Sequence, residues 1–272
     1  MSTTQEHSVS PHKQGQVRLH FDNPPVTETS IGFYFQKIEG WNLLHQGVLW
    51  ERFRAKYPVL EILPPILDVA PQTKLHLDLT SPIMRTGFSN REKTQLVQIQ
   101  DGLLLHNWRK TTESPEYHRY AETRQQLHED WNTFWGYLRQ NSLKDPAVSR
   151  CEVSYFNHFV RNEDWKDFSE LSDIFTVWKA LPQSSSYGTV HMAGFNVFYQ
   201  LDSGVANIAV QPAIRSSDGK EIIQFTLTSS ALPQSSEEGE LFRCLDECHE
   251  NARRVFVDFT TEKVRERWKQ TR

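Results

Sequence analysis

The sequence predicts an α+β protein of two tandem β-α-β-β-β-α units, whose antiparallel sheets lie side by side with the long helices packed on one face. Two runs carry this prediction. The strand-like run 27–35, which ends in aromatic residues, precedes a helix, further strands and a long amphipathic helix, and the run 151–157 begins the same order again. We therefore expect a flexible tail over 1–16, a first unit over 17–145 and a second unit over 146–272.

The elements of the first unit follow from periodicity and from turn-forming residues. Asn23-Pro24-Pro25 suits entry at a sheet edge, before a strand over 26–36. Apolar residues at helical spacing predict a helix over 42–57, and Asp101-Gly102 indicates a tight hairpin. The proline-rich stretch 60–82 is expected to run over the surface. The remaining predicted elements are strands over 85–89, 95–100 and 103–109 and a helix over 116–139.

The second unit repeats this order after Asp145-Pro146. Turn-forming residues around Gly204 and Gly219 predict a meander of three antiparallel strands, which follows a strand and a helix. The unit ends in a long helix and a second helical piece. The predicted ranges are strand 150–159, helix 165–178, strands 189–201, 205–214 and 221–228, helix 240–258 and helix 260–270.

Composition limits the possible classes of function. The 272 residues carry a net charge of −4, with 38% hydrophobic, 24% charged and 12% aromatic residues, which is a globular balance with aromatic-rich cores. The acidic balance disfavours nonspecific nucleic-acid binding. Three cysteines, no signal-like start and no long apolar run predict a soluble cytoplasmic protein that does not enter a membrane.

The sharpest candidate site is the segment from His106 to Lys110, where a base, an amide and two cations end a strand. These side chains could converge on a ligand. The alternative is structural: strand alternation sends Trp108 into the core, while Asn107 and Arg109 pair locally with Glu28 or Glu51.

A pocket between the two halves is a second possibility, formed by Glu28, Asn107, Arg109 and Asn157. The full set of candidate residues for a ligand or partner is Glu28, His106, Asn107, Arg109 and Asn157. No nucleophile elbow or glycine-rich phosphate loop occurs in the sequence, so we name no catalytic residue and expect no cofactor.

The cysteines favour a structural role over metal binding. Cys244 and Cys248 share one face of a predicted helix, and Cys151 or a histidine could join them around a metal ion. Structural zinc sites, however, draw closely spaced ligand pairs from turns, and His249 points about 100° away from Cys248 around the helix. We expect buried small side chains and no metal.

The C-terminal helices carry seven cations interleaved with Glu262 and Glu266. Mixed signs at helical spacing are typical of an exposed, salt-bridged face, and a partner or RNA surface is the alternative. The exposed strand faces of a duplicated sheet could also form a saddle whose apolar and basic residues meet nucleic acid, and the acidic net charge argues against it.

Several short motifs resemble a sporadically distributed family of uncharacterised bacterial proteins over nearly the full length. They are Asn23-Pro24-Pro25-Val26 with Glu28, Trp50-Glu51-Arg52, Gln98-Ile99-Gln100, His106 to Lys110, Tyr117, Tyr120, Trp131, Phe134, Glu152 to Asn157, Leu245, His249, Phe256, Thr260 and Trp268. The family commonly has Leu-Thr-Tyr-Ile-Asn where this chain has Val153-Ser154-Tyr155-Phe156-Asn157. The resemblance implies that the whole fold is shared with this family. It implies no reaction, cofactor or catalytic residue.

These observations predict a non-enzymatic binding or regulatory protein of bacteria that engages a protein partner through its sheet face or an aromatic surface. The sporadic occurrence of the resembling family suggests a mobile or defence-associated system. The alternatives are a small-ligand or nucleotide-handling protein, enzymatic or not, and a nucleic-acid-binding protein.

Overall fold

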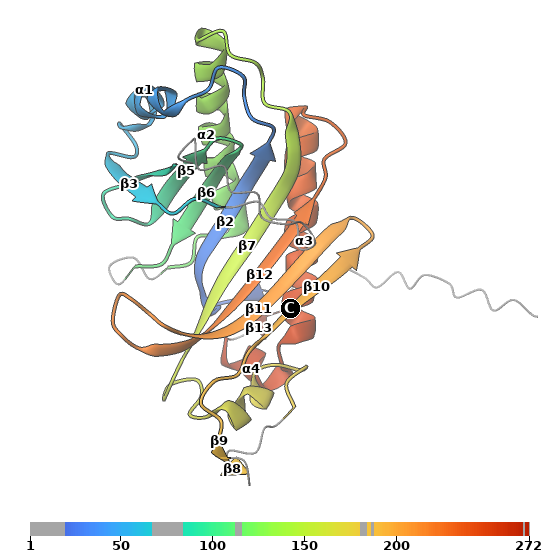
Figure 1. Cartoon of the computed structure of the whole chain (residues 1–272). Coiled ribbons are helices and arrows are strands. Elements are labelled where there is room, and N and C mark those ends of the chain that lie inside the picture. The colour runs from blue at the N-terminus through green and yellow to red at the C-terminus, as the bar shows by residue number, and fades with distance from the viewer. Residues whose placement is uncertain are drawn as a thin grey trace, which may run out of the picture.

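A single nine-stranded antiparallel sheet organises the protein (Figure 1). The computed structural model describes residues 20–66, 84–111, 116–179, 184–185, 188–268 and 270–271. The strand order is β10-β11-β12-β7-β2-β6-β5-β4-β3. The α+β class and the antiparallel pairing predicted from the sequence are confirmed.

The N-terminal half of the sheet matches the sequence prediction closely. Its strands are β2 (Val26–Phe35), β3 (Val59–Leu63), β4 (Arg85–Ser89), β5 (Gln95–Gln100) and β6 (Leu103–Arg109). The predicted hairpin between β5 and β6 is present, and Gly102 takes the positive φ of 96° that a glycine tolerates best. The bounds predicted for β4, β5 and β6 are confirmed.

The C-terminal half joins the same sheet through its first strand. The strands are β7 (Val148–Val160), β10 (Phe195–Leu201), β11 (Gly204–Ile214) and β12 (Glu221–Ala231). β7 pairs antiparallel with β2 at the centre. Outward from this central pair the order is β6-β5-β4 on one side and β12-β11-β10 on the other. Each half therefore places its last long strand beside its first.

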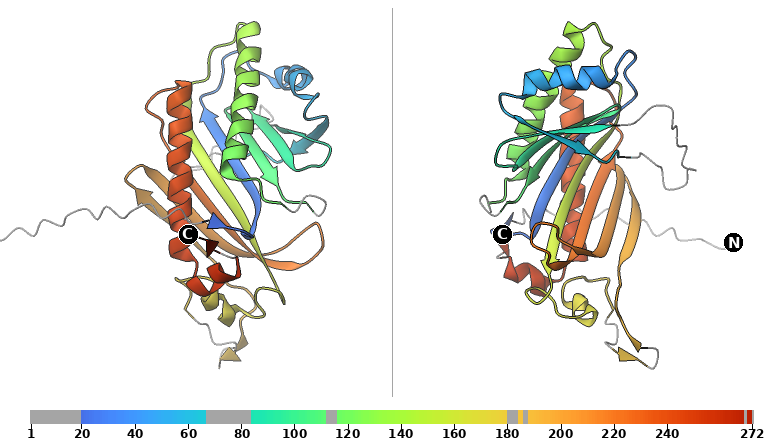
Figure 2. Two further views of the ribbon diagram at one scale, coloured as in Figure 1. Left: turned by 180° about the vertical axis from the view of Figure 1, so that it is seen from behind. Right: turned by 60° about the vertical axis from the view of Figure 1, so that its left-hand side comes forward.

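Two long helices, α2 (Tyr120–Gln140) and α3 (Glu238–Phe259), lie on one face of the sheet, as Figure 2 shows from behind. We call this face the helix face. Aromatic side chains fill the layer between helices and sheet: the ring of Phe33 lies 4.6 Å from Trp131 and 5.6 Å from Phe242. One contiguous core spans both halves.

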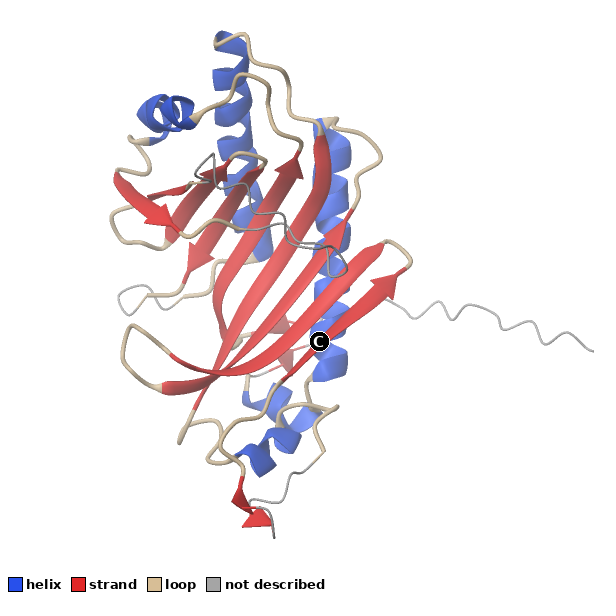
Figure 3. Cartoon of the chain, in the orientation of Figure 1, coloured by secondary structure: helices blue, strands red, loops and turns tan. Residues whose placement is uncertain are grey.

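The other face of the sheet is turned toward the viewer in Figure 3, where no helix of the described chain covers it. We call it the open face. Alternation along each strand assigns side chains to the two faces: Phe33 and Phe35 are buried on the helix face, while Glu28 and Ser30 point to the open face. A small apolar group on the open face consists of Tyr34, Leu103, Leu105 and Ile66.

The helix predicted over 165–178 was wrong. Only a short 3₁₀ helix, η1 (Phe168–Asp173), forms there, after Asp167 caps its N-terminus. The main chain beyond it pairs with the segment that follows α3: Thr176 N donates to Phe259 O and Thr261 N to Ile174 O. These tertiary hydrogen bonds replace the helical ones, so the described residues of the second half include no counterpart of α1 (Leu43–Phe53).

The other departures lie at the periphery. The stretch 60–82, predicted as a surface excursion, begins within the edge strand β3, and its residues from 67 onward lie outside the described chain, as does the predicted tail 1–16. The last helical piece is only α4 (Glu262–Arg267). Two-stranded ribbons join β1 (His20–Phe21) to β13 (Gln270–Thr271) and β8 (Ser184–Ser185) to β9 (Gly188–Thr189). None of the described helices is both long and apolar enough for a membrane crossing.

Candidate functional site

Three of the predicted site residues meet on the open face of the N-terminal half. Glu28 in β2 lies opposite Arg109 in β6, and Ser30 lies opposite Asn107. Asn107 Nδ2 donates to Glu28 Oε1 at 2.6 Å, and Arg109 Nε donates to the same oxygen at 3.2 Å. The alternative of local pairing with Glu28 is therefore confirmed, and Trp108 is buried in the core as that alternative required.

This group extends across three further strands, β5, β4 and β3. Gln98 Nε2 donates to Asn107 Oδ1 at 2.7 Å, and Arg85 Nη1 donates to Gln98 Oε1 at 2.6 Å. Arg109 Nη1 also lies 3.5 Å from Glu61 Oε2. We call this set the charged cluster: Glu28, Glu61, Arg85, Gln98, Asn107 and Arg109.

The charged cluster is neutral overall and combines two buried amides with partly exposed charged groups: the side chains of Arg109 and Glu28 are 29% and 27% exposed. Asn107 is 2% exposed and Gln98 is 3% exposed. Burial holds the pKa of the Arg85 guanidinium below its usual value. Two carboxylates face two guanidinium groups, so most of the desolvation cost is offset by hydrogen bonds within the group.

His106 and Asn157 do not join this cluster, because both point to the helix face. His106 Nδ1 lies 2.6 Å from Asp130 Oδ2 on α2, and Tyr57 Oη also donates to that carboxylate at 3.2 Å. Asn157 Nδ2 donates to Phe225 O at 3.0 Å, inside the core. The pocket predicted from Glu28, Asn107, Arg109 and Asn157 therefore does not assemble, since neighbouring residues of a strand alternate between the two faces.

The open face of the C-terminal half has a different character. One row of paired residues crosses four strands as Ser154, Thr228, Asn207 and Phe198, and the next row is Phe156, Thr226, Ala209 and Asn196. We call these eight residues the uncharged face. It combines hydroxyl and amide groups with two phenylalanines, and Phe198 is 51% exposed.

A cluster of rings lies on the helix face, between α2, α3 and β7. Tyr120 stacks on His249 with ring centroids 3.9 Å apart, and Tyr155 Oη lies 2.7 Å from His249 Nδ1. Tyr120 Oη and Arg124 Nε both donate to Asp246 Oδ1 at 2.8 Å. Burial lowers the pKa of His249 to about 4, so the imidazole is neutral near neutral pH.

The sequence offered no chemical signal for this ring cluster. Tyr120 and His249 lie 129 positions apart, and in the sequence His249 stands out only as a candidate metal ligand beside Cys248 and as part of a resembling motif. The cluster joins two helices to the sheet.

The three cysteines are free and buried, as expected. Cys151 on β7 faces α3, where the Cys248 sulfur lies 3.8 Å from Cys151 O. Within the described ranges, no group of three histidine, cysteine or acidic side chains is arranged to hold a metal ion.

Cations of the C-terminal helices are engaged locally. Lys263 Nζ lies 2.7 Å from Asp173 Oδ2, and Arg253 Nη1 lies 2.8 Å from Glu250 Oε1. Arg267 donates to the main chain of Asp164. These contacts support the salt-bridged interpretation of these helices over a nucleic-acid surface.

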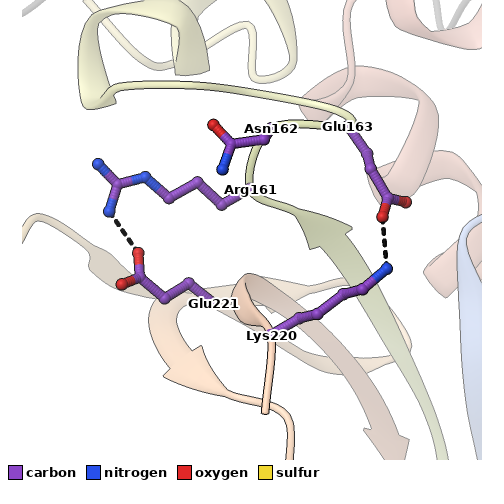
Figure 4. A pocket seen from close by; sticks show the side chains of 5 residues that line it. All are labelled: Arg161, Asn162, Glu163, Lys220 and Glu221. Atoms are coloured by element: carbon purple, nitrogen blue, oxygen red, sulfur yellow. Dashed lines mark hydrogen bonds and ion pairs between the residues drawn. The ribbon is translucent and has the colours of Figure 1, made fainter. Parts of the chain in front are cut away.

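A hollow of 540 Å³ lies at the far end of β7, where Arg161, Asn162, Glu163, Lys220 and Glu221 line it (Figure 4). Its charges are already paired: Arg161 with Glu221, and Lys220 Nζ with Glu163 Oε1 at 2.6 Å. Solvent-exposed ion pairs line the hollow. Each pair stabilises the fold only slightly, and together they leave no charge free to select a ligand.

No protein-family model matches the chain, and no curated protein matches it.

Proposed function

We propose that this chain is a non-enzymatic binding protein of bacteria that engages a protein partner through the uncharged face. The observation that carries the proposal is the pair of residue rows across β7, β12, β11 and β10, which present hydroxyl, amide and phenyl groups and no charge. Neutral polar groups lose little hydration free energy on contact with a partner, compared with charges.

The chemistry of this face favours a protein over a nucleic acid. The hydroxyl and amide groups of Thr226, Thr228 and Asn207 both donate and accept hydrogen bonds, which suits the main chain and neutral side chains of another protein. Phe156 and Phe198 add aromatic contact area. A phosphate backbone would require arginine or lysine, and neither occurs among the eight residues.

The cellular setting is also a proposal. The sporadic occurrence of the resembling bacterial family supports a mobile or defence-associated system, and the few cysteines support a reducing cytoplasm. In that setting the partner would be a protein encoded with this chain.

We further propose that the two halves derive from one β-α-β-β-β-α unit, divided near residue 146. The matching outward order of strands supports this, while β3 and the replacement of a helix by η1 are departures from it. Relatives whose residues equivalent to 26–140 and 148–259 align with each other would support a duplication, and a set of relatives in which they never align would contradict it.

One observation favours a second function, the binding of a small anion at the charged cluster. Arg85 Nε is buried and has no hydrogen-bond partner among the described residues. An anionic ligand could accept from it. Calorimetry with a panel of nucleotides and carboxylates tests this: binding that is lost in Arg85→Gln supports it, and no heat from any of them removes it.

Quantitative affinity capture from the native host tests the main proposal. The full chain is compared with Thr226→Lys, which places a charge in the centre of the uncharged face, and with Gln125→Lys, which adds the same charge on the exposed side of α2. A protein captured by the wild type and by Gln125→Lys but lost with Thr226→Lys supports the proposal. Equal capture by all three contradicts it.

A further inference from the structure

The edge strand β10 lacks the usual protection of an exposed edge. It is the outermost strand of the sheet, and in the described chain nothing pairs with its outer side (Figure 1). Its seven residues, Phe195–Leu201, include no charge and no proline, and Phe198 and Tyr199 are 51% and 41% exposed. Natural proteins commonly protect such edges with lysine, proline or bulges, because unpaired main-chain groups recruit further strands.

The opposite edge of the same sheet is protected. β3 is only five residues long, carries Glu61 in its centre and is followed directly by Pro64 and Pro65. Of the two edge strands of the nine-stranded sheet, only β10 in the C-terminal half is therefore unprotected.

The hairpin that joins β10 to β11 fixes which main-chain groups are free. Leu201 pairs with Gly204 across a two-residue turn, and the closing pair of such a turn is hydrogen-bonded. Hydrogen-bonded pairs alternate along an antiparallel ladder, so Phe195, Val197, Tyr199 and Leu201 direct their main-chain groups to β11. The N–H and C=O groups of Asn196, Phe198 and Gln200 point outward.

The order of residues along β10 is self-complementary about Phe198. If two copies of β10 pair antiparallel around a two-fold axis at Phe198, the three outward-facing residues meet one another. Asn196 then lies opposite Gln200 of the partner subunit, and Phe198 lies opposite Phe198 of the partner subunit. On the helix-face side, Val197 meets Tyr199 of the partner subunit, and Phe195 meets Leu201 of the partner subunit.

We propose that β10 is a dimerisation edge, where a second copy of this chain adds its own β10 and the two nine-stranded sheets become one continuous sheet. Amide faces amide, aromatic faces aromatic and apolar faces apolar. No like charges meet, because β10 has none. Asn196 and Phe198 of β10 also belong to the uncharged face, so the partner-binding function proposed above is tested separately, at Thr226.

Charge variants at Phe198 test the proposed two-fold axis directly, because Phe198 of one subunit would lie opposite Phe198 of the partner subunit. Sedimentation velocity of the full chain should show a dimer that dissociates on dilution. F198K alone and F198E alone should each weaken dimerisation at least about tenfold, since like charges then lie directly opposite. An equimolar mixture of F198K and F198E should restore a dimer, and neutral F198T should retain one.

A proline variant separates main-chain pairing from side-chain contact. F198P removes an N–H that points away from β11, so the hairpin should survive while the dimer is lost. Circular dichroism and the melting temperature report whether the fold is kept, and the charge pair decides the matter if F198P does not fold. A wild type that is monomeric at its highest attainable concentration, or a mixture of F198K and F198E that forms no heterodimer, overturns the proposal.

Discussion

The two halves of the open face use the same sheet surface in opposite ways. A single row of paired residues runs from Asn107 through Ser30 and Ser154 to Thr228 and beyond. On the N-terminal side this row enters a network of paired charges around the buried Asn107, and on the C-terminal side it continues as neutral side chains, from the buried Ser154 to the exposed Phe198. The charged surface is held together by its own hydrogen bonds, and the neutral surface is the one that we propose binds a partner.

The difference has a simple physical basis. Charges on a sheet face must be paired and hydrogen-bonded before they can be buried, and once paired they resist rearrangement. Neutral hydroxyl and amide groups can exchange water for a partner at little cost. We therefore expect substitutions to change stability in the charged cluster and to change binding in the uncharged face.

The largest expected effect comes from Asn107→Leu. This change removes the partner of both Glu28 and Gln98 inside a buried network, and we expect a loss of about 4 kcal/mol in the free energy of unfolding. Thr226→Val is the matched control on the uncharged face, where the change should stay within about 0.5 kcal/mol. Urea unfolding of both variants measures this, and equal losses would remove the contrast between the two surfaces.

Acid should act on the C-terminal half through His249. The unfolded imidazole binds a proton near its ordinary pKa of about 6.5, whereas the folded one does so only near about 4. Between these two pH values the unfolded state binds more protons than the folded state. The neutral His249 imidazole therefore contributes fully to the free energy of unfolding above about pH 6.5, and this contribution is lost as the pH falls toward 4. That loss is roughly 3 kcal/mol.

The control for this prediction is His249→Phe, which keeps a ring stacked against Tyr120 and removes the titration. Urea unfolding across this pH range should show a shallower loss of stability for the variant than for the wild type. An NMR titration of the wild type that places the pKa of His249 near 6.5 would contradict the buried, neutral imidazole.

The smallest effect is expected at the hollow near the end of β7. Lys220→Ala removes the ion pair with Glu163, whose two side chains are about half exposed. Such pairs are screened by water, so the free energy of unfolding should change by less than about 0.5 kcal/mol. A loss comparable to that of Asn107→Leu would mean that this exposed ion pair stabilises the fold as much as the charged cluster does.

Local sequence patterns predicted the regular elements well. Turn residues and alternation located β4, β5 and β6, because their hairpin geometry is set within a few residues. The helix predicted over 165–178 does not form because the main-chain groups of Ile174 and Thr176 pair with Thr261 and Phe259, some 80 residues away. Such tertiary competition is invisible to a local window.

The candidate site was predictable only in part. Strand alternation correctly placed Trp108 on the helix face and Asn107 on the open face. The same alternation should have placed His106 and Asn107 on opposite faces. The orientation of Asn157 could not be read from its strand, because Tyr155, Phe156 and Phe159 place aromatic residues on both faces. Glu61, Arg85 and Gln98 were not predicted, since only sheet pairing brings three other strands to Asn107.

Site-specific photo-crosslinking in living cells of the native host tests most directly whether the uncharged face is the docking surface. A photoreactive amino acid is placed at position 226 on the uncharged face, and in a second variant at position 125 on the exposed side of α2. If the uncharged face is the docking surface, position 226 gives one discrete protein adduct and position 125 gives none. Adducts of equal yield from both positions, or an adduct from position 125 alone, would contradict it.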